Sequence, residues 1–151
     1  MLNAEQSFEE RVRASFDQQR LMTAIGARMT KVTPGEVVIE LPFRSDLTQQ
    51  HGFVHAGVIT AIVDSACGYA ALSLMPADSG VLTVEYKANF ISPARGSKFI
   101  ATGRVVKSGR TLTVCAGEVV AAEDGKETVV ATMLATMMRL LEKGSSSNKS
   151  D

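Results

Sequence analysis

The feature that most constrains the fold is one long apolar segment in the middle of the chain, from Val54 to Met75. At about 20 residues, it approaches the length of a helix that spans a bilayer. Asp64 lies at its centre, however, where a carboxylate is costly in lipid. The segment is too long for one strand, is rich in alanine, and holds no proline before Pro76. The sequence therefore predicts a helix over about 55–74, apolar on nearly all sides and enclosed by the rest of a soluble protein.

The segments before this helix predict a smaller helix and two strands. Phe8, Val12 and Phe16 recur at four-residue spacing on a polar background, which indicates an amphipathic helix over residues 5–19. A turn at residues 31–35 then separates two strands, the second of which alternates apolar and polar residues.

The segments after the helix alternate with a period of two. They predict strands over residues 81–90, 98–106, 111–121 and 128–141. In the first of these, two sets of side chains are expected on opposite faces: Leu82, Val84, Tyr86, Ala88 and Phe90 on one, and Thr83, Glu85, Lys87 and Asn89 on the other. The order predicts one α+β domain over residues 1–143, with about four strands in antiparallel meander in a sheet curled around the helix, and a disordered polar tail over 144–151.

The composition argues against several classes of partner. Sixteen basic residues balance sixteen acidic ones, so there is no basic excess of the kind that nucleic acid or an anionic membrane attracts. The two cysteines, Cys67 and Cys115, lie in apolar runs and form no zinc-ligand spacing with the two histidines. Residues 1–20 hold no unbroken apolar stretch of the kind that a signal peptide needs. We therefore expect no metal, no membrane, no nucleic acid and a reducing, cytoplasmic location.

Asp64 is the residue that most suggests chemistry. Aspartate is seldom buried without a partner, because removing a carboxylate from water is costly. No Lys or Arg lies between Arg44 and Lys87, so a nearby charged partner in the sequence is missing. Asp64 is then either a structural residue bonded to an amide or a hydroxyl, or a carboxylate that faces a substrate cavity.

His55 lies where the polar loop meets the start of the helix. The first amides of a helix, here those of Ala56 and Gly57, are unpaired and suit the oxyanion of an acyl-transfer intermediate. His55 and Asp64 are nine residues apart, which in a helix is a rise of about 13 Å and half a turn of rotation. They cannot meet in one site of one chain. If both act on one substrate, the protein must be at least a dimer with shared sites.

Four segments of the chain carry recognisable motifs: Gln49–Val58 with Asp64 beyond it, Thr83–Tyr86, Phe90–Ala94 and Lys107–Thr111. Together they resemble one known family, the phenylacetic-acid-degradation type (PaaI-like) hotdog thioesterases. The resemblance covers residues from about 20 to 140 in the same order. It implies a sheet wrapped around the helix, pairing into dimers and often tetramers, and hydrolysis of acyl-CoA at the subunit interface without metal or cofactor.

The resemblance also implies a role for each residue of the site. Asp64 matches the general base or nucleophile, and the backbone N–H of Ala56 matches the group that polarises the thioester carbonyl. His55 matches the residue that orients this turn, Gln49 a residue that positions the attacking water, and Thr83 a hydroxyl that contacts the water or the carboxylate. The family usually has His-Gly-Gly where this chain has His-Ala-Gly; alanine keeps the N–H donor.

The hairpin formed by Lys107, Gly109 and Arg110 has two interpretations. It is either a solvated turn or a site for the phosphates of CoA, to which Lys and Arg are suited. Arg95 is a further candidate of the same kind.

Two other functions on the same fold stay open. A non-catalytic acyl-CoA binding module would bind the thioester without turnover. A hydratase would need an Asp several residues ahead of the His, and Asp46, nine positions before His55, fits that arrangement poorly.

Overall fold

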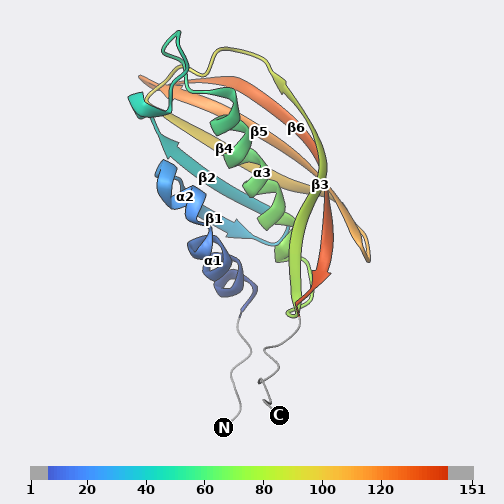
Figure 1. Ribbon diagram of the computed structural model, residues 1–151. Coiled ribbons are helices and arrows are strands. Elements are labelled where there is room, and N and C mark those ends of the chain that lie inside the picture. Colours follow the sequence, from blue (N-terminus) through green and yellow to red (C-terminus); the bar gives the residue numbers. More distant parts are fainter. Residues whose placement is uncertain (1–6, 143–151) are drawn as a thin grey trace, which may run out of the picture.

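The computed structural model describes residues 7–142, so the predicted disordered tail over 144–151 lies outside the described residues. Three helices and six strands follow in the order α1 (Phe8–Gln18), α2 (Arg20–Ile25), β1 (Arg28–Thr33), β2 (Glu36–Pro42), α3 (Ala56–Ser73), β3 (Ser79–Phe90), β4 (Lys98–Ser108), β5 (Leu112–Glu123) and β6 (Lys126–Leu141), with a short 3-10 turn at Ser45–Leu47. The strands form one antiparallel sheet that curves around α3, which confirms the predicted hotdog fold (Figure 1).

The order of strands differs from the predicted meander. The sheet runs β1-β2-β4-β5-β6-β3, so only β4, β5 and β6 form a meander, and β3 lies at the far edge beside β6. Residues 91–97 carry the chain from that edge back to β4, past the first turn of α3 (Figure 1). Sequence alternation identifies strands but does not specify their neighbours, because pairing depends on contacts between distant segments.

The N-terminal helix predicted over residues 5–19 corresponds to α1, and the short helix α2 that follows it was not predicted. Ser7 caps α1 in a capping box with Glu10, and the chain leaves helical geometry at Gln19 before α2 begins. The predicted apolar stripe is confirmed, since Val12 and Phe16 are buried. Phe16 packs edge-on against Tyr69 of α3, with ring centroids 5.9 Å apart.

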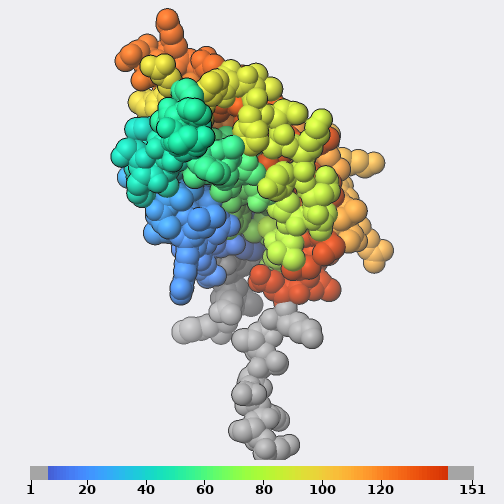
Figure 2. All heavy atoms as spheres, turned by 45° about the horizontal axis from the view of Figure 1, so that its top comes forward, coloured from blue at the N-terminus to red at the C-terminus, as the bar shows by residue number. Residues whose placement is uncertain are grey.

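The central helix α3 is enclosed along its second half but not along its first. Every residue from Ser65 to Ser73 is buried, and α3 also has the length and hydropathy of a membrane span, as core helices can. Gly57, Thr60, Ala61 and Asp64, at helical spacing, form a stripe that is only partly covered. Figure 2 shows the first turns of α3 in green at the surface, between the preceding loop and β3. The prediction of a helix enclosed on all sides was therefore wrong for its first half.

A β-bulge at Val84 overturns the predicted faces of β3. Thr83 pairs with Met137 of β6 and Glu85 with the next residue, Thr136, so Val84 has no partner of its own. Met137 is fully buried on the face toward α3, whereas Thr136 lies on the other face and bonds Glu85. Because residues opposite each other share a face, Thr83 points toward α3 although Glu85 points away. Beyond the bulge, Tyr86, Ala88 and Phe90 join Thr83 on the α3 side, while Leu82 lies on the outer face.

Candidate active site

Asp64 and Thr83 form the central pair of the candidate site. The Thr83 hydroxyl donates a hydrogen bond of 2.7 Å to Oδ1 of Asp64, and it lies 3.3 Å from Sδ of Met137. Asp64 is half-buried, and burial raises the pKa of its carboxyl group, while the Thr83 hydrogen bond lowers it in part. No basic side chain among residues 7–142 forms a salt bridge with it. A carboxylate held in this way is available as a base or nucleophile.

The carboxylate faces a hollow of about 500 Å³ between α1, α3 and the start of β3. The far side of this hollow is formed by Ser15 and Gln18 of α1 and by Gln19, which caps that helix. Sequence reasoning missed these residues, because nothing in their spacing links a polar face of the first helix to Asp64.

The start of α3 presents one free amide and one occupied amide. His55 is the N-cap, and its Nδ1 accepts a hydrogen bond of 2.8 Å from the N–H of Gly57. The expectation that both first amides are available is therefore wrong for Gly57. The N–H of Ala56 has no acceptor among residues 7–142, and Ala56 is exposed. A side chain at position 57 would crowd the cap, since an added Cβ would lie 3.0 Å from Nδ1 of His55.

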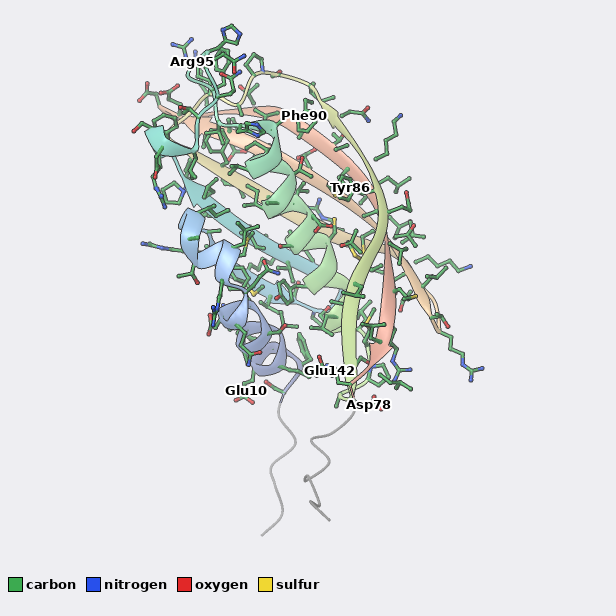
Figure 3. The ribbon with its side chains drawn as sticks, in the orientation of Figure 1. Glu10, Asp78, Tyr86, Phe90, Arg95 and Glu142 are labelled. Atoms are coloured by element: carbon green, nitrogen blue, oxygen red, sulfur yellow. The ribbon has the colours of Figure 1, made fainter. Side chains whose placement is uncertain are left out.

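Gln49 closes the loop that leads into α3. Its Oε1 accepts a hydrogen bond from the N–H of His51, and its backbone N–H bonds the carbonyl of Phe53 at 2.9 Å. Gln49, His55 and Ala56 line a second hollow, of about 330 Å³, whose other walls are mostly apolar. Phe90 of β3 forms one of these walls and lies beside the first turn of α3 (Figure 3).

The two halves of the predicted site thus line different hollows of one chain. Asp64 and Thr83 line the larger hollow, and His55, Ala56 and Gln49 line the smaller one. The described chain does not bring the two groups together.

The candidate phosphate-binding residues are also separated. Lys107, Gly109 and Arg110 lie in the exposed β4–β5 hairpin and line neither hollow. The N–H of Gly109 donates to the carbonyl of Leu112 at 2.8 Å. Glycine is required at this position because an added Cβ would lie only 2.4 Å from that oxygen. Arg95 lies at the end of the molecule where α3 begins (Figure 3).

A third hollow connects Arg95 to the start of α3. It shares Phe53, Ser92 and Pro93 with the smaller hollow, and its lining includes Arg95 and Lys126 together with Glu123 and Asp124. Sequence reasoning did not single out Lys126, the first residue of β6, because nothing in its spacing links it to Arg95. Nowhere in residues 7–142 do three or more His, Cys, Asp or Glu side chains gather as a metal site would require.

Comparison with known proteins identifies the class. Residues 51–128 match the family model of the Thioesterase superfamily, and the chain therefore belongs to that superfamily and is a thioester hydrolase. A thioesterase family protein from Silicibacter pomeroyi is 49% identical, with a TM-score of 0.88 over 89% of this chain and 99% of that one. Human acyl-coenzyme A thioesterase 13 is 26% identical over 83% of this chain and 91% of its own length.

A further comparison shows the fold that the resemblance to PaaI-like proteins implies. The PaaI protein of Escherichia coli has the same fold, with a TM-score of 0.80 and 19% identity over 88% of this chain and 93% of that one.

Proposed function

We propose that the protein is an acyl-CoA thioesterase in which Asp64 of one subunit and the Ala56 amide of another act on the same thioester. The observation that carries this proposal is the half-buried Asp64 carboxylate, with its raised pKa, held by the Thr83 hydroxyl at the edge of a hollow of about 500 Å³. A carboxylate in that setting is a stronger base than one in water.

The proposed reaction is hydrolysis of the thioester bond. Asp64 takes a proton from a water molecule, whose oxygen attacks the carbonyl carbon. The Ala56 N–H donates a hydrogen bond to the oxyanion that develops. The carbon–sulfur bond then breaks, the CoA thiolate takes up the proton from Asp64, and the free acid leaves. Direct attack by Asp64 on the carbonyl carbon is the alternative; it forms a mixed anhydride and releases the CoA thiolate. Water then hydrolyses the anhydride and supplies the proton that the thiolate takes up. Attack of this water on the aspartyl carbon leaves its oxygen in Asp64, which mass spectrometry after one turnover in labelled water detects.

The free edge of β3 supports a dimer. β3 is twelve residues long and pairs on one side only, with β6. Tyr86 and Phe90 face the α3 side yet are 47% and 51% exposed. A long apolar edge of this kind is normally covered or paired. Antiparallel pairing of two β3 edges around a two-fold axis would cover the open stripe of α3 and bring the start of one α3 toward Asp64 of the other.

The same pairing suggests a path for CoA. The hairpin with Lys107 and Arg110 lies at the end of the sheet opposite the start of α3, so antiparallel pairing would carry it toward the partner's Ala56. Arg95 and Lys126 lie near Ala56 within the chain, although Glu123 and Asp124 partly offset their charge. Substituting Arg110 by Ala should raise KM for an acyl-CoA about tenfold while leaving KM for the matching pantetheine thioester unchanged. The same two KM values are measured for Arg95→Ala. The variant that shows the effect identifies which of the two arginines binds the CoA phosphates.

The first experiment is turnover of a panel of acyl-CoAs by the wild type, Asp64→Asn and Ala56→Pro. Proline suits the first helical position, and His55 is already extended (φ −58°, ψ 137°), so Ala56→Pro removes the N–H without disturbing the helix. Each variant should lose about 10²–10³-fold in kcat or more. Ala56→Gly, which keeps the amide, is the matched control and should stay active.

Other outcomes would redirect the proposal. Binding of acyl-CoA without turnover by the wild type would identify a binding module in place of an enzyme. Full activity of Asp64→Asn would exclude the proposed role of Asp64 as base or nucleophile.

The cytoplasm is proposed as the location, supported by the two free, buried cysteines.

A further inference from the structure

The hollow beside Asp64 continues along α3 well beyond the reacting group. Its α3 lining consists of Asp64, Ser65, Gly68, Tyr69 and Leu72. These residues form one stripe of the helix, which over eight residues rises about 12 Å. A volume of about 500 Å³ is within the range of small-molecule sites. The hollow is therefore much larger than the attack of a water molecule on a thioester requires.

Gly68 keeps this hollow open. It lies in the interior of α3, where glycine is less favourable than alanine. A Cβ added at this position would meet no atom closer than Sδ of Met137, at 4.0 Å. By contrast, a Cβ at Gly103 or Gly117, which also face α3, would lie about 2.5 Å from its atoms. The close approach of α3 therefore explains why glycine is needed at positions 103 and 117 of the sheet. It does not explain the glycine at position 68.

The wall of the hollow opposite Gly68 is polar, whereas a long unsubstituted acyl chain would favour an apolar lining. Two hydrogen bonds tie α1 and its C-cap Gln19 to α3 across this wall: the Ser65 hydroxyl donates to the side chain of Gln19 at 3.0 Å, and the hydroxyls of Ser15 and Tyr69 are bonded at 3.3 Å. Gln18 also lines the hollow from an exposed position, and its side-chain amide bonds to no group among residues 7–142. Ser15 contacts Tyr69 and Gln19 contacts Ser65, so α1 runs antiparallel to α3 along the hollow. Gln18 therefore lies near the end of the hollow that holds Asp64.

We propose that this hollow holds the acyl group, that Gly68 determines how large an acyl group fits, and that Gln18 favours acyl groups with a hydroxyl near the thioester. The proposal rests on the proposed thioesterase function. CoA would then leave the reacting centre on the opposite side, through the smaller hollow of the second subunit, which Ala56 lines. The substrate class is a multi-carbon acyl-CoA with an oxygen function close to the carbonyl.

The size claim is tested with Gly68→Ala on unbranched acyl-CoAs from acetyl to decanoyl. The methyl fits without contact closer than 4.0 Å, so the melting temperature should stay the same or rise. The chain-length optimum should move to shorter acyl groups, with a fall in kcat/KM of about tenfold at the wild-type optimum. An unchanged optimum, or an equal loss at every length, would overturn the assignment of the hollow.

The polarity claim is tested with Gln18→Met, which keeps the length of the side chain. The readout is the ratio of kcat/KM for 3-hydroxyhexanoyl-CoA to that for hexanoyl-CoA. The wild type should prefer the hydroxylated substrate about tenfold or more, and Gln18→Met should lose that preference. Arg20→Met, at an exposed position near the same helix end, is the control and should keep it. A wild type that hydrolyses both substrates equally overturns this claim, whereas a wild type that hydrolyses no acyl-CoA overturns the proposed function.

Discussion

At the scale of single residues, Asp64 couples the proposed chemistry to stability. Burial raises its pKa in the folded protein above the value of 3.8 for an exposed aspartate. The folded state therefore holds the proton at pH values where the unfolded state has lost it. The sign follows from linkage: the free energy of unfolding decreases as pH rises from the unfolded pKa through the folded one. Above that window, the ionised carboxylate destabilises the fold.

Asp64→Asn should therefore be more stable than the wild type at neutral pH while being inactive. The amide has almost the same shape and needs no ionisation. The difference in melting temperature should shrink as the pH is lowered below the pKa of an exposed aspartate. Thermal unfolding monitored by circular dichroism at several pH values measures it. A variant less stable than the wild type at neutral pH would indicate that the ionised carboxylate has a structural role.

Thr83→Val should shift the pH dependence of activity. The Thr83 hydrogen bond stabilises the ionised form of Asp64 and lowers its pKa. Without this bond the pKa rises, so the acid limb of the kcat/KM profile should move to higher pH. Activity should fall most at low pH and least on the plateau. An acid limb that does not move would mean that the limb reports another group.

At the scale of elements, the close contact between α3 and the sheet depends on small residues. At Gly103 of β4, an added Cβ would lie 2.4 Å from the backbone of Ala66 and Cys67. Backbone cannot move aside as a flexible side chain can, so the helix would have to shift as a whole. The position of Asp64 relative to Thr83 depends on this contact and on the bulge at Val84.

Gly103→Ala should lower the free energy of unfolding by about 1–3 kcal/mol or more. Urea unfolding measures the change, and Gly68→Ala is the matched control, because it adds the same methyl to α3 at a position where space exists. If both substitutions had the same effect, the closeness of β4 to α3 would not be the cause.

At the scale of the whole molecule, the proposed active site requires two chains. Asp64 and Ala56 line different hollows of one chain, and the free β3 edge is the surface that would join two copies. Each two-fold dimer would then hold two equivalent sites, each built from both subunits.

Mixing two inactive variants tests this arrangement. Asp64→Asn and Ala56→Pro chains, unfolded together in equal amounts and refolded, should recover about a quarter of wild-type activity, because half of the dimers are mixed and each of these has one intact site. Each variant refolded alone is the control. No recovery, with mixed dimers shown by native mass spectrometry, would place both groups in the same subunit's site.

Much of this architecture could be predicted from the sequence. Helix α3 followed from an apolar run too long for a strand, and its ends were placed within about two residues. The strands followed from their alternation, and the separation of His55 from Asp64 followed from the rise of a helix. These features depend on local periodicity, which a short stretch of sequence specifies by itself.

Only the tertiary structure decided the rest. The pairing of β3 with β6, the bulge that turns Thr83 toward Asp64, and the hollow bounded by α1 each depend on contacts between segments far apart in the chain. A one-residue bulge reverses the face of every residue on one side of it, and alternation alone cannot reveal where it falls. The sequence by itself determined the two longer helices and the strands, and it marked Asp64 as a carboxylate within an apolar helix. Packing determined which side chains Asp64 contacts.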